Sequence, residues 1–168
     1  MITALAFLFA LITSSALASS EPPPTTIGSG MAVEGDVLSV NGAIVRLWGV
    51  DAPDVGQTCK TRRSKEYDCF TFSKNALNNI VREKQIICYI KGQDRNGQKI
   101  GICAVNGYDV AALMVRAGWA LSYDGLSTQY ASLMGNAQAK ERGLWGGRVE
   151  PPWQWRTRKQ AEDAKKKR

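Results

Sequence analysis

The sequence contains no histidine, and this absence removes several classes of enzyme. Hydrolases with a Ser-His-Asp or Cys-His arrangement need a histidine base, as do ribonucleases that use histidine for acid–base catalysis. A His-Glu-x-x-His zinc site is excluded for the same reason. The chain also lacks a Gly-x-x-x-x-Gly-Lys-Ser/Thr loop, so nothing indicates nucleotide hydrolysis of the P-loop type. Chemistry based on carboxylates is what remains.

Long hydrophobic runs are scarce as well, and the one that occurs stands at the start of the chain. Residues 1–18 are apolar and end in Ala16-Leu17-Ala18, a pattern typical of a secretory signal peptide cut after Ala18. The run is too short and too rich in serine to suit a membrane span, although an uncleaved anchor is the alternative. We expect a secreted or periplasmic protein whose mature chain has 150 residues, no transmembrane segment and the length of one domain.

The basic charge is concentrated at one end of the chain. The net charge is +7, but residues 156–168 contain seven basic and two acidic side chains and so account for most of it. This basic tail is either a solvated, frayed helix or a tether to a polyanion or a membrane surface. Charge alone is therefore weak evidence for a nucleic-acid site on the domain itself.

Four cysteines in an exported chain predict two disulfides. If residues 94–97 form the turn of a hairpin, the numbers of cross-strand partners add up to 191, which places Cys88 opposite Cys103. Cys59 and Cys69 then form the second pair. A zinc site is disfavoured, because there is no Cys-x-x-Cys spacing and no histidine. Free buried thiols are the remaining alternative.

Composition and periodicity divide the rest of the chain into three parts. We predict a flexible leader rich in Pro, Ser and Thr at 19–30, an ordered domain at 31–155 and the basic tail at 156–168. Strand patterns occupy 31–33, 37–40, 43–50, 86–91 and 99–105, with a polar loop over 51–68. Helical patterns occupy 73–83, the segment between Asp109 and Gly118, and 128–142. This order predicts an α+β fold with an OB-fold-like, five-stranded β-barrel and three helices.

Asn41-Gly42 predicts a tight hairpin, because both residues accept the positive φ of a type I′ turn. With a two-residue loop, Arg46 pairs with Val37 and lies on the opposite side of the sheet from Asp36. Asp36 can therefore approach Arg46 only if the chain bends at Gly35.

Three acids and one arginine stand at the ends of these two strands, namely Asp36, Arg46, Asp51 and Asp54. Each has an ordinary explanation as a turn acid, a loop acid or an ion-pair partner. Together they suit a hard cation, which takes oxygen ligands, and a phosphate, which a guanidinium binds. The cluster indicates metal-assisted attack on a phosphodiester.

The sequence resembles the staphylococcal nuclease-like (thermonuclease) family. The resemblance rests on Gly35-Asp36, the run Arg46-Leu47-Trp48-Gly49-Val50-Asp51-Ala52-Pro53-Asp54, Gln57, Cys59, the turn at 94–98, the run 115–120 and Gly143-Leu144-Trp145. It implies calcium-dependent hydrolysis of DNA or RNA. One Ca²⁺ ion would be held by Asp36, Asp51 and the backbone carbonyl of Ala52, while Arg46 would bind the phosphate and Tyr123 a nucleotide. We expect a monomer.

The departures from the family pattern concern catalysis. Asp54 stands where the family has its essential glutamate, and Gln98 stands where it has a second arginine; Arg95, in the same turn, is the nearest substitute. Met134 aligns loosely with an acid of the last helix. These changes predict slow turnover or none. The alternatives are an inactive module that binds a polyanion or glycan, and an accessory of envelope or exopolysaccharide assembly.

The tryptophans invite a role in base stacking, but packing is the better explanation for two of them. Trp119 and Trp145 each follow a glycine that ends a helix, where a large apolar side chain usually fills the core.

Overall fold

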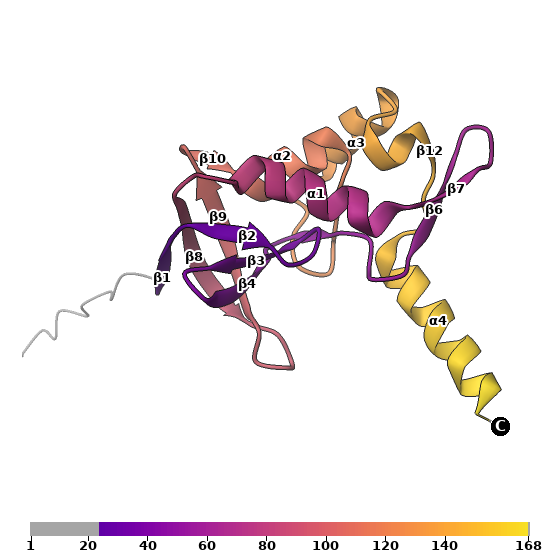
Figure 1. Cartoon of the computed structure of the whole chain (residues 1–168), viewed down its shortest axis with the longest axis horizontal. Helices are drawn as coiled ribbons and strands as arrows, with labels where there is room; N and C mark the ends of the chain where they lie inside the picture. Colours follow the sequence, from indigo (N-terminus) through magenta and orange to yellow (C-terminus); the bar gives the residue numbers. More distant parts are fainter. Residues whose placement is uncertain (1–23, 168) are drawn as a thin grey trace, which may run out of the picture.

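The computed structural model describes residues 24–167, which form a mixed β-sheet with helices packed against it (Figure 1). The strands run in the order β1-β8-β9-β4-β3-β2, and β10 pairs with β9. All these pairs are antiparallel except β4 with β9. The strands are β1 (Thr25–Gly28), β2 (Gly30–Ala32), β3 (Val37–Val40), β4 (Ala43–Leu47), β8 (Ile86–Gln93), β9 (Lys99–Val105) and β10 (Tyr108–Asp109). The predicted α+β class is confirmed.

The hairpin of β3 and β4 follows the predicted register. Asn41 and Gly42 have φ values of 47° and 80°, as a two-residue type I′ turn requires. Val37 is the cross-strand partner of Arg46, and Val40 is that of Ala43. The local sequence was sufficient here, because the turn fixes the register of both strands.

The second hairpin, β8 with β9, carries one of the two disulfides. Cys88 lies opposite Cys103 and is bonded to it, and Cys59 is bonded to Cys69, so both predicted pairings are confirmed. The register shifts by one residue between Ile90 and Gly92, and pairs nearer the turn are offset accordingly. Such a bulge adds twist at the end of the hairpin.

Two small sheets extend the domain beyond the main one. Strand β5 (Val50–Asp51) pairs with β11 (Leu121–Ser122), and β6 (Thr58–Thr61) pairs with β7 (Glu66–Asp68) and β12 (Gly147–Arg148). The prediction of a polar loop over 51–68 is therefore wrong for most of its second half. The strands there are too short to show a sustained alternating pattern. Their only sequence signals are single apolar residues between polar ones, Cys59 in β6 and Tyr67 in β7.

The helices are α1 (Cys69–Val81), α2 (Val110–Ala117), α3 (Ala131–Ala139) and α4 (Pro152–Lys166), with a 3₁₀ turn at Gly143–Gly146. Helix α2 has the predicted limits, because Asp109 caps it and Gly118 ends it in a left-handed conformation. Helix α1 begins four residues earlier than predicted, because the side chain of Asp68 accepts a hydrogen bond from Thr71 N at 3.0 Å. Helix α3 is shorter than its pattern, and α4 adds a fourth helix.

The ordered part of the chain extends beyond both predicted limits of the domain. Strand β1 pairs with β8 and lies within the predicted leader, so the ordered domain begins before residue 31. Helix α4 runs through the predicted boundary at 155 and includes most of the basic tail. The predicted signal peptide lies outside the described residues. Within residues 24–167, no helix is long and apolar enough to cross a membrane.

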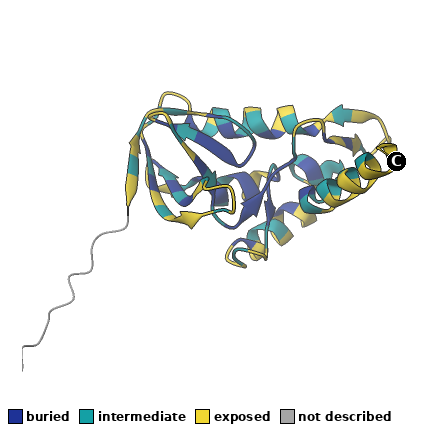
Figure 2. Ribbon diagram, turned by 90° about the horizontal axis from the view of Figure 1, so that it is seen from below, coloured by how far each residue is buried: buried dark blue, intermediate teal, exposed yellow. Residues whose placement is uncertain are grey.

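The core lies between the main sheet and helices α1 and α2 (Figure 2). A second cluster surrounds the Cys59–Cys69 disulfide and contains Leu121 and Leu144. Trp119 and Trp145 are partly buried and pack against this second cluster, which confirms their predicted role in the core. The two clusters fix the strand ends and loops that carry the acidic residues.

Candidate active site

A bend before β3 carries Asp36 into the protein. The backbone N–H of Leu47 donates to Asp36 O at 2.8 Å, and the side chain of Asp36 is almost fully buried. Gly35 permits this path, because a Cβ there would lie 2.1 Å from Ser73 Oγ and 2.7 Å from the Cβ of Ala52. The bend expected at Gly35 is confirmed.

Asp51 and Ala52 reach the same site from the small β5–β11 sheet. Asp51 pairs with Leu121 across that sheet, and both Asp51 and Ala52 are buried. A buried carboxylate needs a counter-charge or hydrogen bonds, since its transfer from water is costly. The buried carboxylate of Asp51 therefore needs a positively charged or hydrogen-bonding partner next to it.

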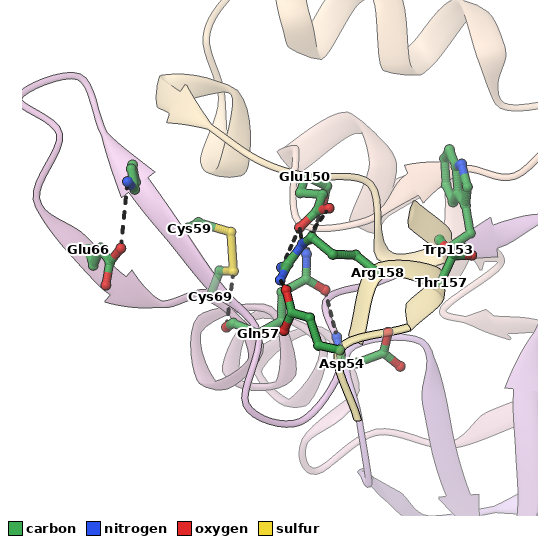
Figure 3. Close-up of polar contacts among 11 residues, drawn as sticks. Asp54, Gln57, Cys59, Glu66, Cys69, Glu150, Trp153, Thr157 and Arg158 are labelled. Carbon is green, nitrogen blue, oxygen red and sulfur yellow. Dashed lines mark hydrogen bonds and ion pairs between the residues drawn. A yellow bond between two sulfur atoms is a disulfide. The ribbon is translucent and has the colours of Figure 1, made fainter. Parts of the chain in front are cut away.

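Asp54 is held in the loop after β5 by the fully buried side chain of Gln57. Gln57 Oε1 accepts from Asp54 N at 3.2 Å, while Gln57 Nε2 donates to Glu150 O at 2.7 Å. Figure 3 shows the Gln57 side chain between Asp54 and the segment that leads into α4. This one amide connects the loop of the site to the helix at the end of the domain.

Two arginines pair with the acids. From β4, Arg46 Nη1 donates to Asp36 Oδ2 at 2.8 Å, and its Nη2 lies 3.9 Å from Glu34. From α4, Arg156 donates to both oxygens of Asp51, at 2.6 and 3.1 Å, and to Asp54 Oδ2 at 2.8 Å. Such paired N–H···O bonds are the strongest contacts that an arginine makes with a carboxylate.

Burial controls protonation at this site. It raises the pKa of Asp36 to about 7, an effect that Arg46 opposes and that Asp51 reinforces. Burial also raises the pKa of Asp54, against the lowering effect of Arg156. Hydrogen bonds to Asp51 raise the pKa of Arg156, which stays charged. Two of the acids thus ionise less readily than free aspartate, which is common at functional sites.

The structure places the remaining predicted site residues elsewhere. Gln98 and the exposed Arg95 lie in the β8–β9 turn, where Asp94 Oδ1 accepts from Gln98 N at 2.9 Å. None of the contacts described within residues 24–167 joins either side chain to the acids. Tyr123 follows β11, and its ring lies 5.4 Å from that of Trp153 in α4. Tyr123 is thus near the start of the helix that carries Arg156.

A calcium ion takes about six to eight oxygen ligands, and the carboxylates of Asp36 and Asp51 with the carbonyl of Ala52 are donors of that kind. In the described arrangement, however, Arg156 binds both oxygens of Asp51 and Arg46 binds Asp36. Within residues 24–167, no three acidic, cysteine or histidine side chains are grouped so as to hold a metal ion. As arranged, these residues do not fit a calcium ion unless Arg156 leaves Asp51.

Sequence reasoning missed Arg156 and the bridging role of Gln57. Arg156 stands at the start of a basic stretch that reads as a solvated tail, and nothing in that stretch distinguishes one arginine from another. The available signal was Pro151-Pro152, because proline favours the first turn of a helix and so places Arg156 one turn further along.

The fold is that of a small α+β domain of the OB-fold-like type. Residues 44–147 match the family described as staphylococcal nuclease homologue, and the chain belongs to that family.

Three relatives illustrate the range of the family. The chain is 31% identical over 151 residues to the succinoglycan biosynthesis protein ExoI of Rhizobium meliloti (strain 1021). The matched region covers 86% of this chain and 76% of that protein. It is 30% identical to the probable staphylococcal-like nuclease CAN1 of Oryza sativa subsp. japonica, over 67% of this chain and 32% of that protein. It is 31% identical to an uncharacterized endonuclease of Haemophilus influenzae, over 67% of this chain and 59% of that protein.

Proposed function

We propose that this protein is an exported nuclease that hydrolyses phosphodiesters of DNA or RNA slowly. Membership of the nuclease family supports the reaction class. The observation that carries the proposal is the meeting of three aspartates and Arg46 at one partly buried site. A guanidinium beside carboxylates can hold a phosphate while an acid acts on water.

In this proposal Arg46 binds a phosphate oxygen and stabilises charge that develops on it. Asp54 orients the attacking water and accepts its proton, and burial raises the pKa of this carboxyl, which makes it a better proton acceptor than free aspartate. Asp36 and Asp51 are proposed as the carboxylate ligands of a calcium ion, with the carbonyl of Ala52. That role requires Arg156 to release Asp51.

The proposed rate is low for two reasons. Asp54 is one methylene shorter than the family's glutamate, and a displacement of about 1 Å can cost about 100-fold in rate. Gln98 has no charge, and loss of an arginine that stabilises a phosphoryl transition state can cost on the order of 10³ to 10⁵. Arg95 lies in the same turn but is exposed.

A second candidate is a non-catalytic accessory of exopolysaccharide production. The name of the Rhizobium relative concerns succinoglycan biosynthesis, and that relative covers more of this chain than either nuclease described above. The pairing of Asp51 and Asp54 with Arg156 also suits a site that has stopped turning over. In this case the domain binds a polyanion or glycan.

The two disulfides support export, because such bonds persist mainly in oxidising compartments. The signal peptide and a monomeric state remain part of the proposal.

The test is digestion of single-stranded DNA and of RNA by the purified protein, with calcium and with a chelator. We expect slow cleavage that disappears in Arg46→Gln and persists in Arg148→Gln, whose exposed side chain bonds to Ser64. Cleavage that survives Arg46→Gln would show that the reaction does not depend on the proposed site. Oligonucleotide or glycan binding without cleavage would favour the second candidate.

A further inference from the structure

Helix α4 presents a guanidinium to the acids from the far end of the chain. Arg156 makes three hydrogen bonds of 2.6 to 3.1 Å, and they engage both oxygens of Asp51 and one of Asp54. The side chain of Asp51 is only 5% exposed, whereas that of Arg156 is 36% exposed. Arg156 therefore approaches a buried acid from the solvent side.

The cluster remains negative after this pairing. Four acids, Glu34, Asp36, Asp51 and Asp54, face two arginines, so with all six groups ionised the net charge is −2. A divalent cation is attracted to such a site and needs oxygen ligands, as a guanidinium does. Because Arg156 uses both oxygens of Asp51, the ion and this arginine compete for the same atoms.

Contacts at its first turns hold α4 in place, while the rest of the helix is free of the domain. Arg158 Nη2 donates to Glu150 Oε2 at 2.8 Å (Figure 3), and Trp153 packs against Tyr123. Pro152 is buried, but residues 160–167 are exposed apart from Asp163. The helix extends away from the domain in Figure 1.

We propose that Arg156 is an internal competitor of the divalent cation, so that its docking on Asp51 and Asp54 and the binding of calcium by Asp51 exclude each other. The choice of calcium rests on the proposed function. The domain then binds calcium only in the fraction of molecules in which Arg156 has left Asp51, and its apparent affinity falls by that fraction. Helix α4 acts as an autoinhibitory segment of the acid site.

The test is calorimetric titration of calcium into the full chain and two variants. Arg156→Gln should bind calcium at least about tenfold more tightly than the wild type, a factor within the usual range for coupled equilibria. Lys165→Gln is the matched control, because it removes the same charge from an exposed position of the same helix and leaves Asp51 and the contacts that dock α4 untouched. Its affinity should stay within about twofold of wild type, since solvent and salt screen an exposed charge outside the cluster.

Thermal unfolding supplies a readout that tolerates a less stable variant. Without calcium, Arg156→Gln should unfold at a lower temperature than wild type, because Asp51 stays buried without its partner. Saturating calcium should raise its midpoint by more than that of the wild type.

The proposal is overturned if Arg156→Gln binds calcium no more tightly than the wild type, or if neither protein binds it. Digestion of single-stranded DNA by the same three proteins separates this inference from the proposed function. Competition without cleavage leaves the inference standing and removes the nuclease. Cleavage of DNA without any competition between Arg156 and calcium supports the nuclease and overturns the inference.

Discussion

Gly35 determines the path of the chain into the acid site, because no side chain fits at its position. We predict that Gly35→Ala lowers the free energy of unfolding by about 1–3 kcal/mol, the usual cost of overpacking. The new methyl group would press on Ser73 and Ala52 and displace Asp36. Urea denaturation measures the loss.

Gly135→Ala is the control for that substitution. Gly135 is exposed in α3 and has open space around it, so alanine there should stabilise the protein by about 0.5–1 kcal/mol. Equal stability of Gly35→Ala and wild type would mean that the bend can relax around a side chain.

The protonation of Asp36 predicts a pH dependence of stability. Its pKa is about 7 in the folded protein against an ordinary value of 3.8. Between these values the folded state holds a proton that the unfolded chain has released, so the contribution of Asp36 to stability falls as pH rises from about 4 to about 7. Asp36→Asn cannot titrate, and its free energy of unfolding should fall less between about pH 4.5 and pH 8 than that of the wild type.

Asp124→Asn serves as the comparison, since Asp124 is an exposed acid outside the cluster. It should keep the pH profile of the wild type in the same denaturation series. An Asp36→Asn profile parallel to that of the wild type would show that Asp36 is ionised throughout.

At the scale of elements, the turn of the β8–β9 hairpin has the uncharged Gln98 where the family has an arginine. We predict that Gln98→Arg combined with Asp54→Glu increases turnover more than it changes the Michaelis constant. Arg46 can bind a phosphate in the ground state, whereas the restored arginine and the longer carboxylate act as charge and bonds shift. Steady-state cleavage of a single-stranded oligonucleotide with calcium measures both quantities.

Asn96→Arg, combined with Asp54→Glu, adds the same charge to the same turn at a different position. It should leave turnover below that of the Gln98→Arg pair. If the two variants gain equally, general attraction of the substrate explains the effect. A folded Gln98→Arg pair that stays inactive would indicate a binding module.

The elements differ in how far the sequence could predict them. Asn41-Gly42 fixes the β3–β4 hairpin through local backbone conformation, and the register of β8 and β9 follows from its turn closely enough to pair Cys88 with Cys103. Strand β1 was not predictable in this way. Its threonines and glycine read as a leader, and its order comes from pairing with β8, about sixty residues away in sequence.

At the scale of the whole molecule, the site was predictable only where its residues lie close in sequence. Asp36, Arg46, Asp51 and Asp54 fall within one short segment, and the hairpin register explains how they approach one another. Arg156 joins them through the docking of α4, which depends on Gln57, Glu150 and the packing of Trp153. Tertiary contacts of this kind leave no periodic pattern in a single sequence.

The separation between Asp51 and Arg156 also has a consequence in time. They are 105 residues apart, and a ribosome adds about 5–20 residues per second, so roughly 5 to 20 s pass between the synthesis of one and that of the other. During this interval the acids of a growing chain have only Arg46 as an arginine partner from the cluster. Until α4 is made, the acids of the nascent chain therefore lack Arg156 and are open to ions from their surroundings.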